Sequence, residues 1–152
     1  MFETRRTVLK ALAGAFAVLQ WRHAAGALRT APSAGATSTP EAFKRALAKA
    51  LDGRPWSESE AISLDVPQLA ENGAIVPITV ESRLPGTARI LVFAERNPGP
   101  LLAQFHFEPD ADGWVSLRIK LNETGPVLAI AEAGGRFYGT RKDVKVMVGG
   151  CG

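Results

Sequence analysis

The sequence contains one cysteine among its 152 residues, which excludes a fold stapled by disulfides within the chain and a zinc site built from several thiolates. Histidine is also scarce, because His23 and His106 are the only two. No glycine-rich loop stands between a strand pattern and a helix pattern to hold phosphate, and no serine stands in a nucleophile-elbow motif. These absences argue against a metalloprotein, a nucleotide-binding protein and a hydrolase, so we expect no cofactor, no metal and no catalytic residue.

Excess positive charge is confined to the N-terminal segment. The net charge is +3, and residues 1–27 hold four basic residues and one acidic residue. The rest of the chain holds 14 residues of each sign. A protein that binds nucleic acid needs a basic face to displace phosphate counterions, so we expect no nucleic-acid partner.

Residues 1–27 have the pattern of an export signal. The pair Arg5-Arg6 precedes an apolar run over residues 8–19, which is shorter than the ~20 residues needed to span a bilayer. Small residues at 25–27 offer a cleavage site. The pattern predicts a twin-arginine signal peptide, a periplasmic location and no membrane contact after cleavage. A retained N-terminal anchor is the alternative, and N-terminal sequencing that starts at Leu28 would argue against it.

The mature chain begins with a polar lead-in at residues 28–39, rich in small residues. A helix is predicted from residue 40 to about 51, with Thr39 as its N-cap, Pro40 at its first position and Gly53 closing it. Apolar residues recur at helical spacing along it, so one face should pack on the domain. The folded domain is expected to span residues 40–148.

Beyond residue 59 the apolar period changes from 3.6 to 2, which indicates strands separated by turn residues. The fold class predicted is mainly β: an immunoglobulin-like antiparallel sandwich of about seven strands with one N-terminal helix and a flexible glycine-rich C-terminal tail. Pro77 lies inside a strand pattern, and because it cannot donate to a ladder, we expect that strand at an edge or with a bulge. The expected strands are 62–66, 76–80, 87–95, 101–107, 115–121, 127–131 and 144–148.

Chemistry-bearing side chains in the domain are few. His106 alternates with apolar residues and is expected on the surface, and Asp110 and Asp112 are expected to serve the turn beside Gly113. Trp56 and Trp114 are expected to pack, with contact to a partner as the alternative for Trp114.

The last strand pattern ends in Gly149, Gly150, Cys151 and Gly152. Glycine has the widest backbone freedom, so this segment is predicted to be a flexible tether carrying the sole thiol. Four residues extend by at most roughly 13–14 Å. No neighbouring residue in the tail can activate the sulfur as a general base would, so the pattern favours a handle for cargo over a nucleophile of catalysis. An intermolecular disulfide of an assembly or adhesion module, or an accidental terminal cysteine, are the alternatives.

Three segments resemble one family. The tail VKVMVGGCG (144–152) resembles the C-terminal signature of SoxY, the sulfur carrier of the periplasmic thiosulfate-oxidising Sox pathway. ENGAIVPITV (71–80) and NPGPLLAQFHF (97–107) resemble further motifs of that family, and the leader agrees with it. The family pattern has one more glycine after the position of Gly152.

The resemblance implies a covalent carrier that is not itself an enzyme. Cys151 would hold a thiosulfate-derived S-thiosulfonate and then a persulfide, on the tether of Gly149, Gly150 and Gly152. The partners implied are SoxZ, in a heterodimer or larger complex, a Sox cytochrome that loads the thiol, a hydrolase that releases sulfate and a sulfane dehydrogenase. For the SoxZ interface, an apolar sheet face of strand 87–95 is preferred over the helix at 40–51, because both faces of that strand are apolar.

Overall fold

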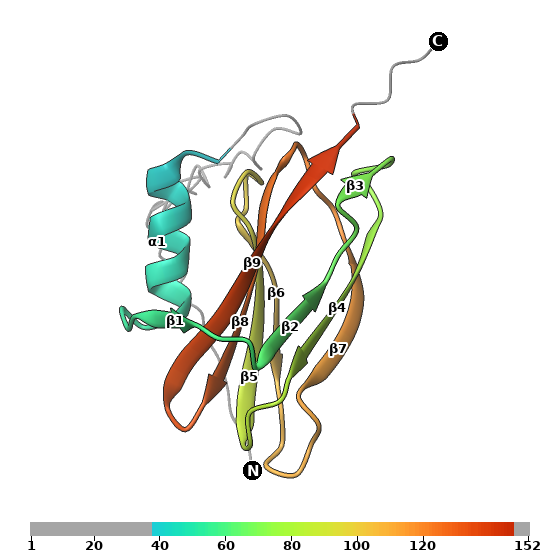
Figure 1. The fold of residues 1–152 in the computed structure, drawn as a ribbon. Coiled ribbons are helices and arrows are strands. Elements are labelled where there is room, and N and C mark those ends of the chain that lie inside the picture. The colour runs from blue at the N-terminus through green and yellow to red at the C-terminus, as the bar shows by residue number, and fades with distance from the viewer. Residues whose placement is uncertain (1–37, 148–152) are drawn as a thin grey trace, which may run out of the picture. The chain divides into compact units, whose positions relative to one another are not determined.

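The computed structural model describes residues 38–147, which hold one helix followed by nine strands in two packed sheets (Figure 1). The expected signal peptide (1–27), most of the lead-in (28–37) and the tail (149–152) lie outside the described residues. The elements are α1 (Pro40–Ala50), β1 (Trp56–Glu58), β2 (Ile62–Asp65), β3 (Leu69–Ala70), β4 (Val76–Ser82), β5 (Thr87–Ala94), β6 (Leu101–His106), β7 (Trp114–Ile119), β8 (Gly125–Ala133) and β9 (Arg136–Val146).

Helix α1 begins and ends as its residues predict. The hydroxyl of Thr39 accepts a hydrogen bond from the Ala42 amide at 3.2 Å, and Pro40 occupies the first turn. Asp52 and Gly53 then adopt positive φ angles of 53° and 71°, which end the helix in the left-handed conformation. The predicted helix is therefore confirmed.

The strands form a sandwich, which confirms the predicted fold class. One sheet has the order β1-β9-β8-β5-β6, with β3 also pairing to β9, and the other has the order β2-β4-β7. Every second side chain of β2 and β4 points inward, so Ile62, Leu64, Ile78 and Val80 are buried between the sheets. Within the described residues the structure adds β1 and β3 to the expected strands and starts the last one eight residues earlier, at Arg136.

A second apolar layer lies between the larger sheet and α1. Leu91 and Phe93 of β5 are fully buried there, and the ring of Phe43 from α1 meets Phe93 edge-on, with ring centroids 6.2 Å apart. Ile90 and Val92, on the opposite face of β5, are buried in the sandwich core. The preference for a face of strand 87–95 as a partner interface is therefore wrong, because this chain itself covers both faces.

The turn between β8 and β9 explains why two glycines stand together. Ala133 pairs with Arg136, so Gly134 and Gly135 form a two-residue hairpin loop. Their φ angles are 57° and 72°, and a type I′ turn requires positive φ at both positions. This turn starts β9, which runs along β8 and then continues toward the C-terminus.

The position of Pro77 differs from the expectation. Strand β4 is central, because it pairs with both β2 and β7 without a bulge. However, β2 ends where Asp65 pairs with Thr79, so Pro77 lies beyond it and has a strand partner only at Arg118 of β7. The missing amide donor is tolerated because β4 has one neighbour at that level.

A charged cluster ties the segment after α1 to the sheet. Glu132 of β8 accepts from Arg54 at 3.0 Å and from the Nε of Arg89 at 2.5 Å, and both guanidinium groups lie over the ring of Phe137. Burial raises the pKa of Glu132, but the hydrogen bonds and charges of the two arginines outweigh burial and hold that pKa below its ordinary value.

Glu132→Gln should lower the free energy of unfolding at neutral pH by about 1–3 kcal/mol, because it leaves the mostly buried Arg89 with only its longer ion pair to the exposed Asp52, at 3.5 Å. A carboxyl with a lowered pKa stabilises the fold fully above its ordinary value of 4.5, and this stability is lost as the pH falls through the lowered pKa. The difference between wild type and variant, measured by urea denaturation across pH, should therefore shrink in acid. A difference that stays constant down to acid pH would contradict this assignment.

Candidate functional site

The residues predicted to carry the cargo, Cys151 with Gly149, Gly150 and Gly152, lie outside the described residues. The structure does place the end of β9, from which that segment continues (Figure 1). Met147 is the last described residue, and Cys151 follows it by four positions. The candidate site is therefore the end of β9, residues 145–147, with the residues that hold it; this is called the tail root.

The end of β9 is held from two sides. Its ladder with β8 ends at Val144, which pairs with Gly125. The amides of Lys145 and Met147 then donate to the carbonyls of Gln68 and Ala70, each at 2.9 Å, beside β3. On the other side, the amide of Val146 donates to Oγ1 of Thr124 at 2.9 Å, so a side chain continues the ladder where β8 has not yet begun. Successive amides at this strand end thus bond alternately to the β3 side and to Thr124, which holds the tail root in place.

The segment 71–80 braces the same strand end. Asn72 forms a turn in which its Oδ1 accepts from the Ala74 amide at 2.9 Å. The carbonyl of Gly73 accepts from the Leu121 amide at 2.7 Å. A Cβ at position 73 would overlap the Leu121 carbonyl oxygen and lie 2.7 Å from Cγ1 of Val146, so only glycine fits there. The motif thus meets the last residues of β9, although about 70 positions separate the two in the sequence.

The Asn-Pro motif at 97–107 has a different role. Asn97 is buried, its Nδ2 donates to the Lys120 carbonyl at 2.6 Å, and its Oδ1 accepts from the Asn122 amide at 3.0 Å. One side chain therefore joins the β5–β6 loop to the segment that follows β7. That segment leads to Thr124, so Asn97 supports the tail root indirectly.

Thr124→Val should loosen the end of β9 without unfolding the domain, because valine keeps the shape of threonine but lacks the hydroxyl that binds Val146. Loss of one such hydrogen bond, about 1 kcal/mol, should accelerate amide hydrogen exchange at Val146 roughly 5-fold. NMR-detected exchange measures this directly. The amide of Lys145, bonded to Gln68 instead, is the internal control, and an equal acceleration at both amides would contradict a specific role for Thr124.

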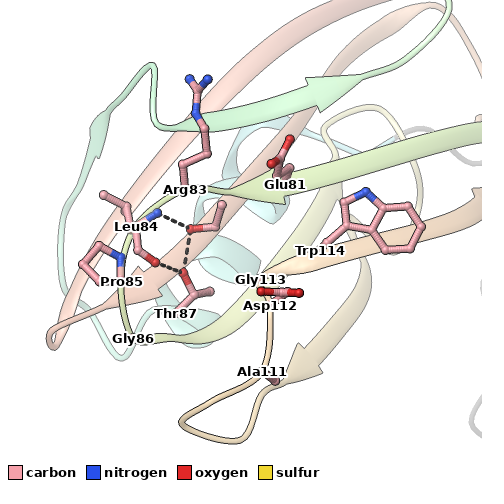
Figure 2. A pocket seen from close by; sticks show the side chains of 11 residues that line it. Glu81, Arg83, Leu84, Pro85, Gly86, Thr87, Ala111, Asp112, Gly113 and Trp114 are labelled. Atoms are coloured by element: carbon pink, nitrogen blue, oxygen red, sulfur yellow. Dashed lines mark hydrogen bonds between the residues drawn. The ribbon is translucent and has the colours of Figure 1, made fainter.

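An open hollow of about 620 Å³ lies between the β4–β5 turn and the start of β7 (Figure 2). Its two hydroxyls, from Ser82 and Thr87, are 2.6 Å apart and are also bonded to the backbone of Leu84. The hollow is also lined by the carboxylates of Glu81 and Asp112, but the two hydroxyls bond each other and the Leu84 backbone, so neither is paired with a base. The hollow is a consequence of the turn and offers no catalytic arrangement.

The remaining sequence predictions concern surface residues. His106 is exposed and bonds Gln104 at 2.7 Å, and Asp110 and Asp112 are exposed in the β6–β7 loop, as expected. Trp56 packs against the layer beneath α1. Trp114 was expected to pack, but it stands on the outward face of β7 with 55% of its surface exposed. Within residues 38–147 no cluster of possible metal ligands occurs, and no helix there is long and apolar enough to cross a membrane.

Sequence reasoning missed the residues that hold the tail root, namely Thr124, Gln68 and β3. Residues 122–126 lie between two expected strands and carry turn-forming residues, and no apolar alternation marks Leu69–Ala70. The parallel pairing of β3 with β9 joins positions 76 apart, so it leaves no local signal. The one available signal was Gly73 in the motif at 71–80, because a glycine there is consistent with close contact to another segment.

Comparison with known proteins gives a consistent result. Residues 47–151 match the family described as sulfur oxidation protein SoxY, a match that extends to the sole cysteine. Among solved structures, the chain is similar to the sulfur carrier protein SoxY from Chlorobium limicola f thiosulfatophilum, at 37% identity and a TM-score of 0.63, over 67% of this chain and 89% of that one. A CARDB domain from Pyrococcus furiosus matches at 10% identity and a TM-score of 0.40, over 57% of this chain and 86% of that one. The curated proteins gave no match.

Proposed function

Because the chain belongs to the SoxY family of sulfur oxidation proteins, we propose that it carries sulfur intermediates of thiosulfate oxidation on the thiol of Cys151. One observation carries the proposal: the family match extends through the braced end of β9 to the only cysteine in the sequence. Gly149, Gly150 and Gly152 serve as the tether. The carrier supplies the attachment point, and its partners supply the catalysis.

The proposed cycle needs an oxidant for its first step. The Cys151 thiolate and thiosulfate together give two electrons to a c-type cytochrome, and a sulfur–sulfur bond forms between Sγ and the terminal sulfur of thiosulfate. A hydrolase then directs water to the sulfonate sulfur, sulfate and two protons leave, and a persulfide stays on Cys151. A sulfane dehydrogenase, where the organism has one, oxidises that sulfur further. Because cargo stays tethered, each enzyme meets it at high effective concentration.

Membership of the SoxY family also suggests a partner protein and a cellular location for this chain. We propose that the chain works in a complex with SoxZ, and that residues 1–27 direct export by the twin-arginine route to the periplasm. This route carries folded proteins, so a partner without its own signal can cross with this chain. N-terminal sequencing of the exported protein should start at Leu28, whereas an intact Met1 would refute cleavage.

Intact-mass analysis without reductant tests the carrier function. The mature protein, incubated with thiosulfate, a thiosulfate-oxidising c-type cytochrome and an oxidised electron acceptor, should gain the mass of one thiosulfate group. Fragmentation should place that mass on the peptide containing Cys151, and omission of the cytochrome is the control. A product consisting only of a disulfide-linked dimer would instead favour the assembly module considered from the sequence.

A further inference from the structure

Exposed apolar side chains stand on three segments that meet at the end of β9. In the described part of the chain, five large apolar residues are strongly exposed, and three belong to segments that meet at the end of β9. They are Leu69, Ile75 and Met147, at 50%, 59% and 53% exposure, here named the collar. Leu69 pairs with Lys145, two residues before Met147, so Leu69 and Met147 share the outward face of the β3–β9 pair. Ile75 follows the Asn72–Gly73 turn that abuts Val146.

The length of the tail determines what must approach the collar. Cys151 follows Met147 by four residues, which extend by at most roughly 13–14 Å. An enzyme that takes the thiol into a channel therefore brings the mouth of that channel to the collar. Large exposed apolar side chains on converging segments are typical of an interaction site, and unbranched Met147 adapts easily to different partners.

We propose that the collar is the docking surface for the enzymes that act on Cys151, and that it packs against an apolar rim around the mouth of each enzyme's channel. This inference rests on the proposed carrier function. The same reach limit applies to the cytochrome that loads the thiol and to the hydrolase that releases sulfate, so both enzymes use the collar. The tail alone then supplies the reactive atom, and the collar supplies much of the affinity.

Two collar variants test the proposal in the full mature chain, purified with any partner that accompanies it. Leu69→Ser/Met147→Ser and Ile75→Ser should each raise KM for the carrier in cytochrome-catalysed loading without changing kcat, the double variant by about 10-fold, because loss of central apolar contacts at an interface has effects of this size. Sulfate release by the hydrolase should slow in parallel. All three side chains are at least half exposed, so the melting temperature should change little.

Trp114→Ser is the matched control. Trp114 is as exposed as the collar residues, but it begins β7, whereas the other end of that strand leads to Leu121 beside Gly73. Seven residues of extended chain separate Trp114 from Leu121, about 23 Å, which exceeds the reach of the tail. Trp114→Ser should therefore leave KM unchanged for both enzymes.

Partner-free loading separates the two hypotheses. Tetrathionate exchanges with a thiolate to give the same S-thiosulfonate and one released thiosulfate, with no enzyme and no net oxidation, so wild type and collar variants should load equally. Wild-type KM in both collar variants, or a collar effect on one enzyme alone, would overturn the docking proposal and leave the carrier function intact. A wild-type protein that accepts no cargo at Cys151 from tetrathionate or from the cytochrome would overturn both.

Discussion

Cys151→Ser should abolish sulfur loading completely. The chain has no other cysteine, and a serine hydroxyl cannot form the sulfur–sulfur bond on which every proposed intermediate depends. In the cytochrome assay, the variant should show no mass gain under conditions that load wild type fully. The effect should be all-or-none, because no second thiol in the chain can substitute.

Two controls make this result specific. The variant should keep the wild-type melting temperature, and it should also remain unmodified by tetrathionate, which needs no protein partner. Any thiosulfate-sized adduct on Cys151→Ser would mean that the cargo is attached elsewhere. The variant should also lose the reductant-sensitive dimers that the wild-type thiol is expected to form on storage.

Phe93→Ala should have the largest effect on stability. Phe93 is fully buried beneath α1, and its ring meets that of Phe43. Truncation of a buried phenylalanine costs about 3–5 kcal/mol, a large part of the roughly 5–15 kcal/mol that stabilises a typical domain. Urea denaturation monitored by circular dichroism should show a much lower midpoint, and α1 should lose much of its packing on the sheet.

Trp114→Ala is the matched control for Phe93→Ala, because it removes an even larger aromatic ring from the outward face of β7. Since more than half of the surface of Trp114 is already in water, loss of its ring should change stability by no more than about 0.5 kcal/mol. Equal losses from the two substitutions would contradict the burial that the structure assigns to Phe93. A small loss from Phe93→Ala alone would indicate that α1 does not pack tightly on the sheet.

Local patterns predicted the elements whose signals are local. Thr39, Pro40 and Gly53 predicted both ends of α1, and period-two alternation predicted β2, β4 and β7 closely. The first eight residues of β9 were missed because residues 139–143 read Gly-Thr-Arg-Lys-Asp, a poor strand sequence that is held in place by its long ladder with β8. Tertiary pairing overrode propensity there.

Predictions that depend on how elements pack were less successful. Apolar residues on both faces of β5 suggested an open interface, but the same pattern describes the middle layer between a sheet and a helix. For the site, the thiol and its glycines could be identified from the sequence, and they stay predictions because they lie outside the described residues. The braces at Thr124 and Gly73 required long-range contacts that no local pattern encodes.

The geometry of β9 also has a mechanical consequence. The strand pairs with β8 along most of its length and with β1 over three residues near its start, and it lies between Thr124 and β3 at its end (Figure 1). In the proposed carrier cycle, a partner that withdraws from Cys151 would pull on the end of this strand. Because the flanking hydrogen bonds are perpendicular to that pull, they bear the load together in shear instead of opening one after another. Force applied at the C-terminal end of β9 should therefore unfold the domain less easily than force that separates the strands one hydrogen bond at a time.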